Sequence, residues 1–350
     1  MSTKVAEINL DRRLSSDSET YNCSRKFRLL SKMTPGAATM GRMSSILWKV
    51  SPGVHDALIK ALTSPVARSL SGTRNRHAVQ NAMQKGRRFI IDVRGKMGFG
   101  ASLTSTVILH HYFRAVPAFA GVTVTNPLYA DLRGHSDLLS SYFDRLNHGV
   151  DEQSCRVPFR FSQDVALAPL DGGLSLREAN RLFFRHYRIR PCFQEEANAS
   201  IDGCIARKIG VHFRGSDKRL EAERVDWLDI TSLIESCMEA YHSDELFVAS
   251  DELGFIDYLR RRYGKRRVSA LECKYLSNGV NGAHLLSGDG FEKGREALLT
   301  IMLLGMCKVC IRGASHLSAW AKIFNPDLSV RVYGDFSAQK SFPEREFAKL

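Results

Sequence analysis

The stretch Gly210–Lys218, GVHFRGSDK, decides the fold of the second half of this 350-residue chain. Apolar residues precede it, which indicates a buried strand that ends in a polar loop. The loop carries His212, Arg214, Asp217 and Lys218 within seven positions. Open α/β sheets bind ligands at the carboxyl ends of their strands, and a guanidinium pairs with a phosphate through two hydrogen bonds. We therefore expect a phosphate-containing ligand at Arg214, although a solvated charged loop would show the same pattern.

Strand and helix patterns alternate along the chain on both sides of this loop. In the second half we expect strands at 205–213, 246–250, 266–270 and 308–312, and helices at 228–241, 255–263, 292–307 and from 313–316 to 324. In the first half we expect a strand at 87–93, a glycine-rich turn at 94–100, a helix at 101–113, a strand at 122–125, and one or two helices over 174–197 broken at Pro191. Short connections between alternating elements favour mainly parallel sheets.

These patterns predict the α/β class, with two doubly wound, Rossmann-like domains. We expect a basic, partly irregular N-terminal extension over 1–85, an N-terminal Rossmann-like domain over 86–199 and a C-terminal Rossmann-like domain over 200–350. The extension contains a helical pattern over 54–71, which fits a docking helix better than a membrane-surface helix.

Composition and charge narrow the class of protein. The chain is 44% hydrophobic and 25% charged, as in soluble globular proteins. It shows no apolar run of membrane-spanning length and no secretory signal, and eight cysteines are too few for a disulfide framework. We therefore expect a cytoplasmic location.

The net charge of +13 is concentrated at the N-terminus, because residues 1–85 hold 14 Lys and Arg against five Asp and Glu. That excess leaves open a peripheral membrane contact through the extension. The scattered arginines and few aromatic residues argue against binding of nucleic acid.

Three polar loops should meet at one edge of the second sheet. Besides the loop quoted above, they are Ser250–Glu252 and Gly313–Ser318. The last one begins a helix, whose free N–H groups favour a phosphate, with Ser315 or Ser318 adding a hydroxyl. Asp251 could accept hydrogen bonds from a sugar or a base, or equally cap a helix. An arginine, a helix-end anion site and a carboxylate together suit a nucleoside diphosphate that carries a sugar.

Several familiar motifs are missing from the sequence. The glycine-rich turn lacks the Lys-Ser/Thr ending of a Walker loop and departs from GxGxxG, so ATP and NAD are disfavoured. No HExxH and no Asp-x-Asp occurs that could hold a metal against a diphosphate. The charge of a leaving diphosphate must then be stabilised by cationic side chains and N–H dipoles, and we expect no metal and no cofactor.

The residues named so far resemble the GT-B fucosyltransferases, a group that includes the rhizobial nodulation and the animal core α1,6-fucosyltransferases. The resemblance rests on residues 88–105, on the HxRRTDK-like stretch 212–218, on the ATDD-like stretch 249–252 and on residues 294–320. It extends over about residues 86–335 in the same order. It implies a GT-B fold, GDP-fucose as the donor, a glycan or oligosaccharide as the acceptor, and inversion without a metal.

The resemblance also implies roles for residues at matching positions. It implies contacts with the nucleotide sugar for Gly98, Gly100, His212, Asp217, Lys218, Asp251, Ser315 and Ser318. Arg214 would stabilise the departing GDP, and Glu221, or its rival Glu223, would act as the base. Two positions depart from the family pattern. Gly215 stands where relatives often have a second arginine, and Thr300 where they have an aspartate that reads the base.

The sequence thus predicts an inverting, metal-independent glycosyltransferase that transfers fucose from GDP-fucose to a glycan hydroxyl. A non-catalytic nucleotide-sugar-binding protein of the same fold is the alternative.

Overall fold

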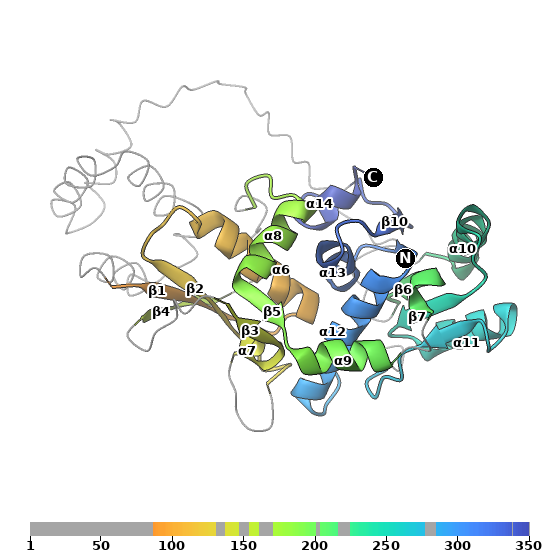
Figure 1. The fold of residues 1–350 in the computed structure, drawn as a ribbon, viewed down its shortest axis with the longest axis horizontal. Coiled ribbons are helices and arrows are strands. Elements are labelled where there is room, and N and C mark those ends of the chain that lie inside the picture. The colour runs from red at the N-terminus through yellow and green to blue at the C-terminus, as the bar shows by residue number, and fades with distance from the viewer. Residues whose placement is uncertain are drawn as a thin grey trace, which may run out of the picture. The chain divides into compact units, whose positions relative to one another are not determined.

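The computed structural model describes residues 87–130, 137–146, 154–160, 171–200, 204–215, 225–276, 285–337 and 339–349. All of them belong to one compact unit that spans residues 57–350. Its described part is built on two parallel sheets surrounded by helices (Figure 1). The expected N-terminal extension, with its helix over 54–71, lies outside the described residues.

The first sheet has three parallel strands in the order β2-β1-β4. They are β1 (Phe89–Arg94), β2 (Phe119–Thr125) and β4 (Cys155–Arg160), and this half also contains α6 (Phe99–Phe113), α7 (Leu138–Tyr142), α8 (Leu176–His186), α9 (Pro191–Ala199) and the antiparallel pair β3 (Phe143–Arg145) and β5 (Tyr187–Ile189). The strand, turn and helix predicted at 87–113 are confirmed. Pro191 begins α9, because proline fits the first position of a helix, where its missing N–H costs nothing; α8 ends earlier, at His186, and β5 lies between the two helices.

The second sheet has five parallel strands in the order β10-β9-β6-β7-β8. They are β6 (Ile209–Phe213), β7 (Leu246–Ser250), β8 (Val268–Ala270), β9 (Val309–Arg312) and β10 (Ser329–Val332), with the helices α10 (Trp227–Tyr241), α11 (Leu253–Tyr263), α12 (Gly290–Met306), α13 (His316–Phe324) and α14 (Glu344–Phe347). The prediction of a strand from residue 205 is wrong at its start. Ile205–Arg207 form a 3₁₀ turn, closed by the N–H of Lys208 on the carbonyl of Ile205, and β6 begins only at Ile209.

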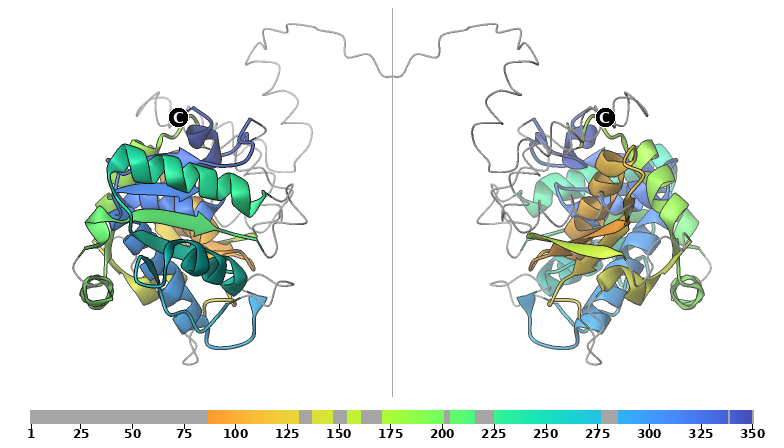
Figure 2. Two further views of the ribbon diagram at one scale, coloured as in Figure 1. Left: turned by 90° about the vertical axis from the view of Figure 1, so that its right-hand side faces the viewer. Right: turned by 90° about the vertical axis from the view of Figure 1, so that its left-hand side faces the viewer.

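Alternation along the strands divides the second sheet into two apolar faces. On β6, Ile209, Val211 and Phe213 belong to a core shared with α10 and α11, which cover one face of the sheet (Figure 2). The other face packs against α12 and α13, whose apolar side chains join a second core that continues into the first sheet. Trp320 of α13 is fully buried there, and its Nε1 donates to Thr104 of α6 at 3.0 Å. The helices α12 and α13 therefore tie the two sheets together.

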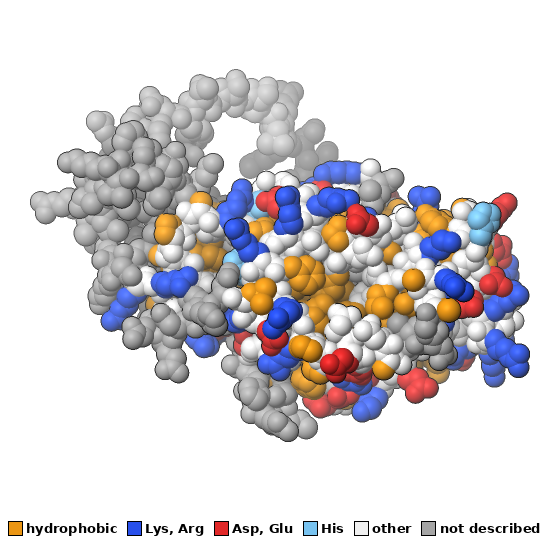
Figure 3. All heavy atoms as spheres, viewed as in Figure 1, with side chains coloured by type: hydrophobic (Ala, Val, Ile, Leu, Met, Phe, Trp, Pro, Cys, Tyr) orange, Lys and Arg blue, Asp and Glu red, His pale blue; other side chains and the backbone are white. Residues whose placement is uncertain are grey.

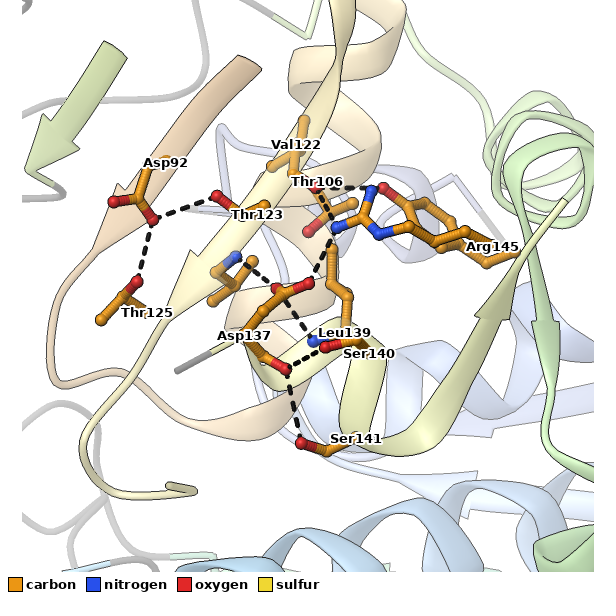
Figure 4. A network of polar contacts seen from close by, with 12 residues as sticks. Asp92, Thr106, Val122, Thr123, Thr125, Asp137, Leu139, Ser140, Ser141 and Arg145 are labelled. Atoms are coloured by element: carbon orange, nitrogen blue, oxygen red, sulfur yellow. Dashed lines mark hydrogen bonds and ion pairs between the residues drawn. The ribbon is translucent and has the colours of Figure 1, made fainter. Parts of the chain in front are cut away.

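A polar network stabilises the segment between β2 and β4 of the first sheet (Figure 4). The carboxylate of Asp137 accepts hydrogen bonds from Arg145 at 2.9 Å and from the N–H of Val124 at 2.8 Å. Arg145 also donates to the carbonyl of Val122 at 2.7 Å. Because these bonds join α7 and β3 to β2, they hold the small antiparallel pair against the edge of the sheet.

The surface seen in Figure 3 carries Lys and Arg side chains interspersed with Asp and Glu side chains around an apolar area. This mixture agrees with the sequence, in which most of the charge excess falls before residue 86. Among the residues that the structure describes, no helix is both long and apolar enough to span a bilayer.

Candidate functional site

One cavity, of about 730 Å³, lies where the carboxyl end of the second sheet faces the turn between β1 and α6. Its wall is formed by that turn, the ends of β6 and β7, the turn before α13, one face of α12 and part of the C-terminal segment. The carboxyl ends of parallel strands share one edge, so the three polar loops expected to meet do so here.

His212 and Arg214 reach the wall from the end of β6. The carbonyl of His212 accepts the hydroxyl of Tyr333 at 2.8 Å, which fixes the strand end. Burial raises the pKa of Tyr129 well above its usual value, and the nearby positive charge of Arg214 opposes that rise. The hydroxyl oxygen of Tyr129 accepts the N–H of Phe99 at 3.0 Å. Arg214 therefore lies close to a hydroxyl that is held at the start of α6.

Asp251, at the tip of β7, closes the loop that follows β6. Its Oδ1 accepts the N–H of Gly215 at 3.0 Å. A Cβ atom at Gly215 would collide with the buried carboxylate of Glu252 and lie 2.7 Å from Cε1 of Phe213. A larger residue at this position would therefore require the side chains of Glu252 and Phe213 to move.

The first turns of α6 and α13 meet at the cavity, and neither helix begins with a side-chain cap. A Cβ atom at Gly100 would lie 2.6 Å from the backbone of His316 and Leu317, so the close approach of the two helices requires glycine there. Gly98, by contrast, has open space around its Cα. The side chain of Ser315 is 4% exposed, and its Oγ has no hydrogen-bond partner among the described residues. Two positive helix ends and a buried hydroxyl thus converge, an arrangement that attracts anions.

Ser318 lies behind this turn and does not contribute to the cavity wall. Its hydroxyl accepts from Nε of Arg312 at 3.0 Å and donates to the carbonyl of Ser315 at 3.3 Å. Of the two serines considered from the sequence, Ser315 is therefore the one placed to touch a ligand, while Ser318 shapes the turn.

Three buried residues of α12 line the cavity. Burial raises the pKa of Glu296 and lowers that of Lys293. Glu296 accepts the backbone N–H of Lys274 at 2.6 Å and that of Tyr275 at 3.4 Å, which fixes the segment after β8. Thr300 follows one turn later on the same wall, at 8% exposure.

Sequence reasoning missed Tyr129, Glu296 and Glu344, which all line the cavity. Tyr129 follows the carboxyl end of the predicted strand 122–125, and that position was a usable signal. Glu296 falls within a helix that is recognisable only as apolar. Glu344 lies in the polar stretch SFPEREFAKL near the C-terminus, which resembles a solvated tail.

Some of the expected residues cannot be placed. Asp217, Lys218, Glu221 and Glu223 lie outside the described residues, and their roles stay predictions. Within the ranges that the structure describes, no group of three or more His, Cys, Asp or Glu side chains is arranged to hold a metal ion.

The described residues thus form two parallel sheets around one shared cavity. No protein-family model matches the chain, and neither does any curated protein. Among solved structures, it is similar to NodZ α-1,6-fucosyltransferase soaked with GDP-fucose (16% identity, TM-score 0.47, 73% of this chain and 97% of that chain). It is also similar to NodZ from Bradyrhizobium (16%, 0.44, 69% and 93%) and to a mutant of Arabidopsis thaliana FUT1 in complex with GDP (12%, 0.44, 85% and 82%).

Proposed function

We propose that this chain is an inverting, metal-independent glycosyltransferase that transfers fucose from GDP-fucose to a hydroxyl of a glycan or oligosaccharide. The observation that carries the proposal is the convergence of Arg214, Ser315 and the first turns of α6 and α13 on one cavity. The cytoplasm, suggested by the sequence, is the proposed location.

The anion end of the cavity suits a departing diphosphate. In the proposed step the bond between the sugar C1 and the β-phosphate oxygen breaks, and the acceptor oxygen bonds to C1 from the opposite face. The negative charge that develops on GDP would be stabilised by the guanidinium of Arg214, by helix N–H groups and by the hydroxyls of Tyr129 and Ser315. Donors held in place before the reaction need no reorganisation during it, which is why such arrangements accelerate transfer.

The other end of the cavity suits a nucleoside. Its wall includes Val248, Ala249, Leu271 and Ala297, which offer an apolar surface to a planar base. Thr300 adds a hydroxyl at the same wall. We propose guanine as the base because of the sequence resemblance.

The acceptor hydroxyl must lose its proton to a base in an inverting reaction. Among the described residues, the carboxylates on the cavity wall already accept hydrogen bonds from other groups of the protein. Asp251 accepts from Gly215, Glu296 from the segment after β8, and Glu344 from Arg312. We therefore keep Glu221 as the proposed base, with Glu223 as its rival.

Replacement of Arg214 tests this function directly. With labelled GDP-fucose and EDTA present, Arg214→Ala should lower turnover by roughly 10²- to 10³-fold, the usual loss for one donor to a developing anion. Arg177→Ala is the matched control, because Arg177 pairs with Asp327 at the exposed surface and neither residue lines the cavity. Both variants should unfold like the wild type. Near-normal turnover of Arg214→Ala would contradict the assigned role, and loss of turnover in EDTA would contradict metal independence.

The alternative is a protein that binds the nucleotide sugar without transferring it. Gly215 favours this reading, because it stands where the resemblance places a second arginine beside Arg214. Calorimetric binding of GDP-fucose with no release of fucose or GDP over a day, with or without acceptor glycans, would support the alternative.

A further inference from the structure

Arg312 is a fully buried arginine at the carboxyl end of β9, in register with His212 on the neighbouring β6. A guanidinium loses its hydration when it is buried, so it persists only where acceptors and a counter-charge replace the water. Next to the cavity, the turn before α13 supplies the acceptors for Arg312, and the C-terminal segment supplies the counter-charge.

The turn is that between β9 and α13. Nε of Arg312 donates to Oγ of Ser318 at 3.0 Å, and Nη2 donates to the carbonyl of Ser315 at 2.7 Å. These bonds fix the backbone at the point where α13 begins. They thereby set the direction of the first free N–H groups of the helix and of the Ser315 hydroxyl.

The counter-charge is Glu344, which comes from α14 and lines the cavity. Both of its carboxylate oxygens accept from Nη2 of Arg312, at 2.7 and 2.8 Å. The ring of Phe347 lies 3.9 Å from the guanidinium and closes its remaining side. Nη1 of Arg312 and Oγ of Ser315 have no hydrogen-bond partner among the described residues. The anion end of the cavity therefore contains a negative side chain that is compensated by one cation.

We propose that Arg312 is a positioning residue for the diphosphate, and that Glu344 limits how tightly the diphosphate binds. Arg312 arranges the turn and neutralises Glu344, so that an anion can approach the start of α13. Glu344 leaves a carboxylate near the anion and so favours release of the product. This inference rests on the proposed function only in taking a diphosphate as the ligand.

The two charges should have opposite effects on binding, and a purely structural pair would not. Arg312→Met leaves Glu344 uncompensated and should weaken binding of both GDP and inorganic pyrophosphate by about tenfold or more, from one unit charge at short range in a partly buried site. Glu344→Gln preserves the shape of the side chain, removes the negative charge and should tighten both, by roughly three- to tenfold. Arg312→Lys should recover part of the affinity.

The neighbouring pair Arg345–Asp171 supplies the control. It also anchors the C-terminal segment, at 2.8 Å, but neither residue lines the cavity. Arg345→Met should lower the midpoint of urea unfolding without changing pyrophosphate affinity. Unfolding curves of all variants come first. Arg312→Lys keeps the positive charge opposite Glu344 and keeps the test open if Arg312→Met or Glu344→Gln does not fold, because it should bind pyrophosphate more weakly than the wild type and unchanged affinity would overturn the inference.

Isothermal titration with pyrophosphate, GDP and GDP-fucose separates the outcomes. Opposite shifts for Arg312→Met and Glu344→Gln support the inference. Equal losses in both variants, or no pyrophosphate binding by the wild type, would overturn it. Pyrophosphate binding with the expected shifts but without fucose release would overturn the transferase alone.

Discussion

The structure predicts that Gly100→Ala lowers both the stability of the fold and the affinity for GDP. The added methyl group would lie 2.6 Å from the carbonyl carbon of His316 and from the nitrogen of Leu317, and 2.8 Å from the carbonyl oxygen of His316. These are backbone atoms, which cannot rotate away as a flexible side chain can. Carbon atoms in ordinary contact are about 3.5–4 Å apart, so α6 and α13 would have to separate by about 1 Å.

The energetic consequence follows from two opposing terms. Overpacking of a tight contact costs about 1–3 kcal/mol, while alanine gains up to about 1 kcal/mol over glycine in a helix. We expect Gly100→Ala to lower the free energy of unfolding by about 1–2 kcal/mol. Because the same shift moves the first turn of α13, we also expect binding of GDP to weaken by about tenfold, the loss of one charged hydrogen bond.

Gly98→Ala is the control for this experiment. Gly98 lies two residues earlier, and a Cβ atom added to it would meet nothing within 4 Å. Its φ of −60° is one that alanine adopts without strain. Because alanine is a poorer N-cap residue than glycine, urea unfolding should place this variant about 0.5 kcal/mol below the wild type, less than the loss expected for Gly100→Ala. If Gly100→Ala is as stable as Gly98→Ala and binds GDP equally well, the close contact between α6 and α13 is not what we infer.

Further predictions concern the core, the cavity and pH. His110 and His186 stack with ring centroids 4.1 Å apart, and burial lowers the pKa of both. Below about pH 6.5 the unfolded chain binds protons that the folded chain excludes, so the urea midpoint should fall from pH 7 to pH 5, and His110→Gln should flatten that slope. Trp320→Phe loses the hydrogen bond to Thr104 and leaves a small void, which should lower the free energy of unfolding by about 2 kcal/mol. Tyr129→Phe removes one proposed diphosphate donor, and titration calorimetry should show GDP binding about tenfold weaker, with a stability loss near 1 kcal/mol; unchanged affinity would exclude Tyr129 from the ligand site.

The sequence could predict those elements of the fold that depend on contiguous residues. The apolar run of β1, the glycines after it and the helical order that follows are contiguous, and each element was found. The meeting of the loops at Arg214, Asp251 and Ser315 was predictable too, because parallel strands place their carboxyl ends at one edge. Because the strands are parallel, the three loops form one cavity wall.

What could not be predicted depends on contacts between distant segments. Arg312 pairs with Glu344 only when α14 folds back to the end of β9, and the local sequence around neither residue predicts this pair. The short strands were equally difficult. β4 contains Pro158, and β10 alternates exposed and half-buried residues at the sheet edge, so each depends on its neighbour for pairing.

The position of α12 and α13 has a consequence for how this chain can be altered by recombination. A cut at 199/200, the domain boundary expected from the sequence, would leave Trp320 and the apolar side of α12 facing water and would strip α6 of its cover. Neither product would be a portable module, and grafting one onto a foreign partner should yield insoluble material. A change in the proposed acceptor specificity is therefore expected from substitutions in surface loops and not from exchange of whole halves.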